Sequence, residues 1–131
     1  MRVSITEGRK LLRQSAPERQ VQQAIVDYLT AQGIPFAVTD AAEAFNRRGQ
    51  RIRRVTPGWP DITACDREFL AIECKCAGGG KLSPLQAKTL NRLHQRGALV
   101  VVARSVDDVI ELLQTRRTSA ATIAEIVAAL P

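Results

Sequence analysis

At 131 residues the chain is long enough to bury one apolar core and so to fold as a single domain. Apolar residues make up 45% of it and charged residues 24%, a composition that excludes a disordered or fibrous protein. The formal net charge of +6 favours a polyanionic partner without deciding the matter.

Residues 1–14 form a basic N-terminal arm for which the sequence predicts no definite structure. The arm has neither the apolar stretch nor the cleavage site of a secretion signal. The longest apolar runs, such as residues 98–103, are far shorter than the roughly 20 residues that a membrane span needs. We therefore expect a cytoplasmic protein that does not bind membranes.

A helix is predicted from Ser15 to Gly33. Ser15 can cap it, Pro17 suits its first turn, and glycine commonly ends a helix. Its apolar residues recur with the helical period and share one face, which the core should cover: Val21, Ile25, Tyr28 and Leu29.

Short strands are predicted at residues 34–39 and 50–55, and a basic run overlaps the second of them. Such a run is most often a solvated face. Its composition nevertheless favours phosphate recognition, because the planar guanidinium of arginine can bind two phosphate oxygens at once. Five of the eight residues from 47 to 54 are arginines: Arg47, Arg48, Arg51, Arg53 and Arg54.

A turn at residues 57–60 leads into two further strands, at 61–65 and 69–76. The polar residues between these strands predict a hairpin that turns at Arg67. In that register, residues whose numbers add up to 134 face each other.

This register places Asp61 opposite Glu73. Opposed carboxylates repel each other across a sheet and would destabilise a purely structural hairpin. A divalent cation between them replaces repulsion by coordination, and Mg²⁺ prefers a few carboxylates together with phosphate oxygens. Lys75 lies two residues beyond Glu73 and therefore on the same face. Taken alone, a Glu-x-Lys pair also fits a solvated strand.

The three cysteines, Cys65, Cys74 and Cys76, are too few and odd in number for a disulfide framework. No second ligand pair accompanies Cys74 and Cys76 at zinc spacing, and the one histidine, His94, is expected to be a solvated helix residue. We therefore expect the cysteines to be small buried hydrophobes in a reduced compartment, with Cys74 and Cys76 facing the core.

Three helices and one buried strand are predicted for the rest of the chain. Each helix begins with a serine that can cap it. The apolar run at 99–102 is typical of a strand covered on both faces. The order of elements predicts an α/β fold in which helices flank a mixed sheet. In chain order the remaining elements are a helix at 83–96, the strand, a helix at 105–113 and an amphipathic helix at 119–130.

The segment Gly58-Trp59-Pro60-Asp61, followed by Ile72-Glu73-Cys74-Lys75, resembles the signature of the PD-(D/E)XK nuclease superfamily. The resemblance is closest to the VRR-NUC (virus-type replication-repair nuclease) family. Further matches are a helix opening with Glu18, the segment Leu82-Ser83-Pro84-Leu85-Gln86, and a valine-rich strand before a serine–aspartate helix start. The resemblance covers residues 15–115, which we take as the nuclease domain, and leaves out the arm and residues 116–131.

The resemblance implies a restriction-endonuclease-like sandwich and a role for each matching residue. Asp61 and Glu73 would be metal ligands, with the backbone carbonyl of Cys74 completing the metal shell. Lys75 would orient the attacking water and offset charge on the phosphate. Two further catalytic residues are implied, an outer carboxylate and a supporting polar residue: Glu18 and Gln86.

Glu18 and Gln86 also have a simpler explanation. Each lies three residues after a serine, Ser15 or Ser83, in the pattern of a capping box, where its side chain only bonds back to the helix start. Both nevertheless share a helix face with apolar residues and so lean toward the sheet. Both interpretations therefore stay open at this point.

The resemblance implies a hydrolase, an Mg²⁺- or Mn²⁺-dependent deoxyribonuclease that leaves 5′-phosphate and 3′-hydroxyl ends. The arginine run would follow the phosphate backbone without reading sequence. The resemblance also implies an endonuclease acting on branched DNA, such as four-way (Holliday) junctions, in bacterial or phage replication and repair. The alternatives are a nucleic-acid-binding module of the same fold without catalysis, and a purely structural protein.

A homodimer would supply the two symmetric cuts that a four-way junction requires. The basic arm is one candidate dimer surface. The other is an apolar stripe on the C-terminal helix, for which packing onto its own domain is equally open: Ile123, Ile126, Val127 and Leu130.

Overall fold

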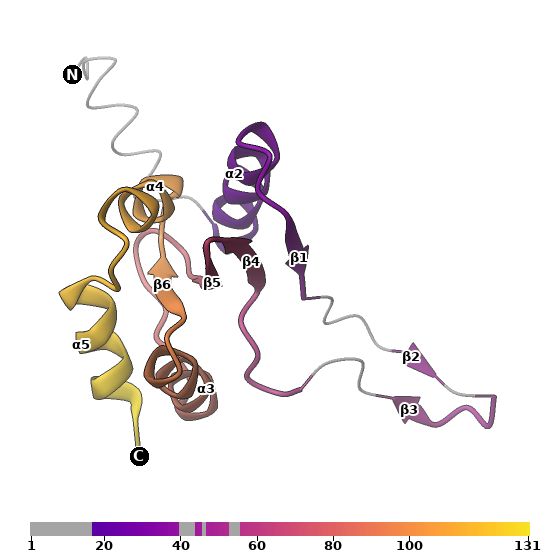
Figure 1. Cartoon of the computed structure of the whole chain (residues 1–131). Helices are drawn as coiled ribbons and strands as arrows, with labels where there is room; N and C mark the ends of the chain where they lie inside the picture. The colour runs from indigo at the N-terminus through magenta and orange to yellow at the C-terminus, as the bar shows by residue number, and fades with distance from the viewer. Residues whose placement is uncertain (1–16, 40–43, 46, 53–55) are drawn as a thin grey trace, which may run out of the picture.

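A computed structural model describes residues 17–39, 44–45, 47–52 and 56–131 of the chain. A four-stranded mixed sheet lies at its centre, with helices on both sides (Figure 1). This confirms the predicted α/β class with a mixed sheet flanked by helices. The strands, in sheet order, are β1 (Phe36–Val38), β4 (Ile62–Asp66), β5 (Glu68–Cys74) and β6 (Leu99–Ala103), and the helices are α2 (Glu18–Ala31), α3 (Pro84–Gln95), α4 (Val106–Thr115) and α5 (Ala120–Ala129).

The sheet is antiparallel from β1 through β5, and β6 runs parallel to β5. Helix α3 makes the crossover between the two parallel strands. A separate ribbon of two short antiparallel strands, β2 (Ala44–Phe45) and β3 (Arg51–Ile52), extends away from the sheet (Figure 1). The sequence predicted β3 as part of a longer strand and did not predict β2.

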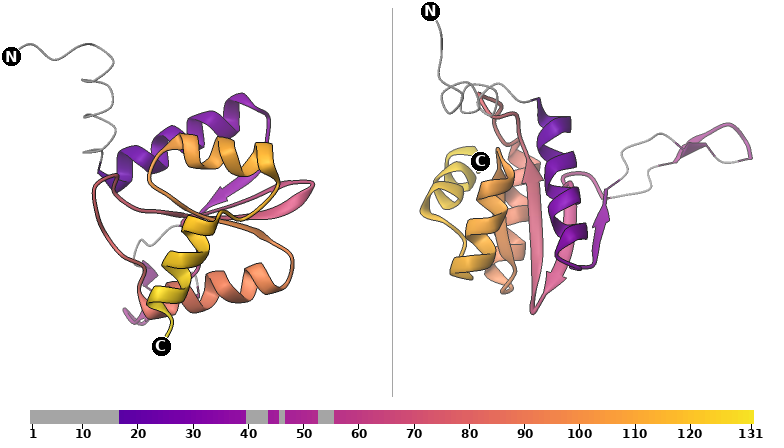
Figure 2. Two further views of the ribbon diagram at one scale, coloured as in Figure 1. Left: turned by 90° about the vertical axis from the view of Figure 1, so that its left-hand side faces the viewer. Right: turned by 90° about the horizontal axis from the view of Figure 1, so that it is seen from above.

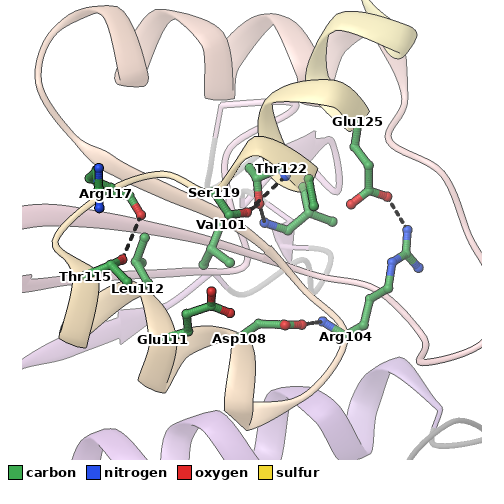
Figure 3. Close-up of a pocket in the computed structure, with 12 residues that line it drawn as sticks. Val101, Arg104, Asp108, Glu111, Leu112, Thr115, Arg117, Ser119, Thr122 and Glu125 are labelled. Atoms are coloured by element: carbon green, nitrogen blue, oxygen red, sulfur yellow. Dashed lines mark hydrogen bonds and ion pairs between the residues drawn. The ribbon is translucent and has the colours of Figure 1, made fainter.

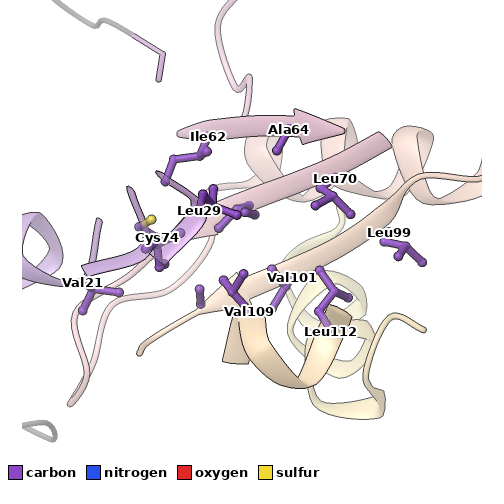
Figure 4. Close-up of a cluster of buried hydrophobic side chains, with 13 residues drawn as sticks. Val21, Leu29, Ile62, Ala64, Leu70, Cys74, Leu99, Val101, Val109 and Leu112 are labelled. Carbon is purple, nitrogen blue, oxygen red and sulfur yellow. The ribbon is translucent and has the colours of Figure 1, made fainter. Parts of the chain in front are cut away.

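Helices lie on both faces of the sheet (Figure 2). Two apolar clusters fill the space between the sheet and these helical layers. Helices α2 and α4 cover one face, where Ile25, Leu29 and Val109 pack against alternate residues of β5 and β6 (Figure 4). Helices α3 and α5 cover the other face, where Leu90 and Ile126 pack against the intervening residues. All five residues of β6 are buried, as the continuous apolar run predicts for a strand covered on both faces.

The helix starts differ in how they are capped. The Ser83 side chain caps α3, and Ser119 caps α5 by accepting from the Thr122 amide at 3.1 Å. Ser105 takes the N-cap position of α4 but its side chain makes no cap bond, so the predicted capping is wrong. Pro17 precedes α2 as its N-cap instead of lying in the first turn, and Ser15 falls outside the described residues.

The outer edge of β6 is closed by side chains. Its Val100 and Val102 amides donate to the hydroxyls of Thr118 and Thr122 at 3.0 and 3.2 Å. The next outward amide, of Arg104, donates to Asp108 at 2.8 Å (Figure 3). Because these amides are satisfied within the chain, this edge does not offer free donors for pairing with another strand.

The C-terminal stripe packs in part onto its own domain, one of the two alternatives left open, since α5 packs against α3 and β6 and leaves Ile126 only 2% exposed. Two predictions about side-chain exposure are wrong. Cys65 is exposed and only Cys74 is fully buried, while Cys76 is half-buried. His94 is half-buried, and its Nδ1 is buried without a partner in the described part of the chain.

Among the described residues, no helix has the length and apolarity to cross a bilayer.

Candidate active site

The β4–β5 hairpin has the register predicted from its turn. Pairs run from Ile62–Ile72 to Asp66–Glu68, and in each pair the residue numbers add up to 134. Arg67 alone forms the turn, in the left-handed region with φ of 69°. Asp61 directly precedes β4, so it and Glu73 lie at the end of the hairpin opposite the turn.

Asp61 is held by backbone contacts on two sides. Its carboxylate accepts a hydrogen bond from the Cys74 amide at 2.8 Å, and its carbonyl accepts one from the Thr39 amide at 2.8 Å. The Thr39 hydroxyl also donates to the carbonyl of the buried Pro60, at 2.6 Å. The bond from Thr39 to its backbone and the bond from Cys74 to its side chain therefore hold the Asp61 carboxylate over the end of β5.

The neighbouring Glu73 carboxyl is 1% exposed, although it is ionisable. One oxygen, Oε1, accepts from the Gln86 side-chain amide at 2.9 Å, and the other, Oε2, accepts no hydrogen bond from a donor among the described residues. Burial raises the pKa of Glu73 to about 8, helped by the negative charge of Asp61 and opposed by Lys75. At neutral pH the metal-free carboxyl is therefore largely protonated.

Gln86 joins the candidate site to the start of α3, because it forms the capping box and also contacts two other predicted site residues. Its Oε1 accepts from the Ser83 amide at 3.0 Å, and Ser83 accepts from the Gln86 amide, so the capping box is formed. The same Oε1 accepts from Lys75 Nζ at 3.1 Å, while Nε2 donates to Glu73. A single side chain thus caps the helix and connects the two polar residues of β5.

Glu18 lies in the first turn of α2 and is exposed. Its charge contributes to raising the pKa of Glu73, which places it near the site, but no hydrogen bond to the cluster is formed. Burial also raises the pKa of the Cys74 thiol well above its usual range, so this thiol stays protonated. The Cys74 side chain also packs in the core cluster of Ile25 and Ile72, so the group that Cys74 can offer a metal beside Glu73 is its backbone carbonyl.

The arginine run is only partly described. Arg47 and Arg48 are exposed near the β2–β3 ribbon, and Arg51 begins β3. Arg53 and Arg54 fall outside the described residues.

Two residues hold the loops around the site in ways that were not predicted from the sequence. Gly58, with φ of 83°, lies so close to α3 that a Cβ there would be 2.7 Å from Leu85 Cγ and 3.0 Å from its carbonyl oxygen. Arg104 donates to the carbonyls of Cys76, at 3.0 Å, and Gly80, at 2.9 Å, and pairs with Glu125. It thereby fixes the glycine-rich loop between β5 and α3. The position of Gly58 before Trp-Pro-Asp indicates a tight turn there, whereas no local pattern indicates the contacts of Arg104.

No protein-family model, curated protein or solved structure is similar enough to this chain to count as a match.

Proposed function

We propose that this chain is a metal-dependent DNA nuclease with a restriction-endonuclease-like fold, as its resemblance to the VRR-NUC family implies. The observation that carries the proposal is the buried Glu73 carboxyl with one partnerless oxygen, beside Asp61 and joined to Lys75 through Gln86. A structural protein gains no stability from burying such a group, because an unpaired buried carboxyl costs free energy.

The residues fit a hard divalent cation such as Mg²⁺ or Mn²⁺. The free Oε2 of Glu73 and the carboxylate of Asp61 are oxygen ligands, and the Cys74 carbonyl is a third. No group of three or more His, Cys, Asp and Glu side chains in the described residues is placed to hold a metal. Two carboxylates and a carbonyl suit Mg²⁺, which keeps several waters and takes substrate phosphate oxygens.

The bound metal would supply Lewis acidity, lowering the pKa of the attacking water and polarising the scissile phosphate. The chain's own residues do the positioning. Asp61 would attract the cation, Glu73 would release its proton as it binds the cation, and Lys75 would orient the water and offset negative charge on the phosphate. Gln86 fixes the Lys75 ammonium and the Glu73 carboxyl relative to each other, while Glu18 adds an outer negative charge.

The substrate in this proposal is branched DNA, such as a four-way junction, cut by a homodimer in bacterial or phage DNA repair. One domain carries one site and makes one cut, so two symmetric cuts need a twofold dimer. Val127, 63% exposed, is the part of the C-terminal stripe that remains free for such a contact. Light scattering tests the dimer, and a mass near 14 kDa rules it out.

The nuclease activity is tested with supercoiled plasmid, linear duplex and four-way junctions, each incubated with protein and Mg²⁺ or with EDTA. We expect Mg²⁺-dependent cleavage, fastest on the junction, with 5′-phosphate ends. DNA binding without cleavage in either Mg²⁺ or Mn²⁺ would instead identify a binding module of this fold. Equal rates on linear duplex and junction would refute the branched substrate alone.

A further inference from the structure

Helix α3 carries a strongly basic exposed face. Residues 81–97 contain four Lys or Arg residues and no Asp or Glu. All four side chains are on exposed residues: Lys81, Lys88, Arg92 and Arg96. The opposite face of the helix is buried, with Ala87 and Leu90 packed on the sheet. Lys88 and Arg92 of α3 are therefore held outward by its apolar side, and Lys81 and Arg96 flank the helix; these four residues define the basic face.

These cations have no partners within the part of the chain that the structure describes. Arg104 and Arg116 pair with carboxylates, whereas no hydrogen bond or ion pair is formed by the side chains of the basic face. Their charges consequently remain available to an external anion. Like charges at four-residue spacing also destabilise a helix slightly, which an external polyanion would relieve.

Helix α3 begins at the candidate site. Gln86, in the first turn of α3, bonds to Glu73 and Lys75, and Leu85 contacts the turn at Gly58 that leads to Asp61. From Gln86 the helix runs ten residues to Arg96, or about 15 Å. That length matches the axial rise of about four base pairs of duplex.

We propose that the basic face of α3 binds the phosphate backbone of the duplex arm on one side of the cleaved bond. The proposal rests on the proposed nuclease function for the position of that bond. The contacts are to phosphates, so they add affinity and orientation without sequence preference. The face is distinct from the arginine run of residues 47–54, which lies before the Gly58 turn in the chain.

The test is the double variant Lys88→Gln with Arg92→Gln, in which both replacements are good helix formers. The matched control is Arg67→Asn with Arg117→Gln, two exposed residues toward the hairpin-turn end of the sheet, away from the site. Asparagine tolerates the left-handed backbone at position 67. Each double variant lowers the net charge from +6 to +4, so only the location of the lost charge differs.

DNA binding is measured by fluorescence anisotropy with a labelled 20-base-pair duplex in EDTA, across a series of salt concentrations. For the α3 variant we expect binding weakened on the order of tenfold and a slope of log K against log salt smaller by about 2. In Mg²⁺, its KM should rise with kcat nearly unchanged. Equal salt slopes for the two double variants overturn the proposal, whether or not the wild type cleaves. If the wild type does not cleave and the α3 variant still has a reduced salt slope, the nuclease function is refuted and the basic face remains a DNA-binding surface.

Discussion

Replacing Glu73 by glutamine should make the metal-free protein less sensitive to alkaline pH. Burial raises the pKa of Glu73 from 4.5 to about 8 in the folded chain. The folded state therefore holds a proton that the unfolded state has lost between these two values. The stability that this proton provides is fully present below pH 4.5 and is lost as the pH rises through 8.

The size of the effect follows from the two pKa values. A shift from 4.5 to about 8 corresponds to about 5 kcal/mol across the whole titration. Between pH 6 and pH 9 the wild type should lose about 3 kcal/mol of this contribution. Glutamine cannot ionise but can still accept the hydrogen bond that Gln86 donates to position 73. The variant should therefore keep its stability over the same range, apart from changes that both proteins share.

The measurement is urea denaturation of both proteins in EDTA at pH 6, 7, 8 and 9. The difference in unfolding free energy between wild type and variant should fall by about 3 kcal/mol from pH 6 to pH 9. Glu111→Gln, which removes an exposed carboxylate of α4, is the control and should follow the wild type. Parallel curves for wild type and Glu73→Gln would falsify the reasoning, since Glu73 would then be ionised normally in the folded protein.

Nearly all cleavage should be lost, with the fold unchanged, in each of three variants: Asp61→Asn, Glu73→Gln and Lys75→Ala. Thermal melts check the fold. Activity within about threefold of wild type contradicts the assignment, because even a tenfold loss of rate corresponds to only about 1.4 kcal/mol of activation free energy. Gln86→Ala should lower kcat and destabilise the protein by about 1–3 kcal/mol in urea titrations, since Glu73 and the Ser83 amide lose a partner. Gly58→Ala should destabilise by about 2 kcal/mol, and an unchanged urea midpoint would contradict the close approach to Leu85.

Most of the site could be predicted because its key relation is local. A one-residue turn at Arg67 and the two-residue period of strands place Asp61 at the same end of the hairpin as Glu73, and the pairs of β4 and β5 follow this register. The capping box of Ser83 and Gln86, one of the two interpretations left open for Gln86, is equally local and is formed. In each case the residues that decide the geometry lie within a few positions of one another.

Other features depended on segments far apart in the chain. The contacts of Arg104 with Cys76 and Gly80 join residues 28 and 24 positions apart, and no periodic pattern signals them. The C-terminal stripe has the same apolar pattern whether it packs on its own sheet or on a second protomer. The structure places Ile126 in the domain's own core, which the pattern could not distinguish.

The sequence by itself determined the four helices and the strands of the central sheet, the hairpin register and the residue types that converge on the site, because backbone periodicity and turn geometry act over short stretches of chain. Only the tertiary structure decided that Glu73 is buried beneath α3 with one oxygen unpartnered, and that its pKa is raised to about 8. Burial removes water from a carboxyl through the packing of distant segments, so its effect on charge cannot be derived from neighbouring residues. For the same reason, the basic face of α3 became apparent only once the packing of Ala87 and Leu90 showed which side of the helix faces outward.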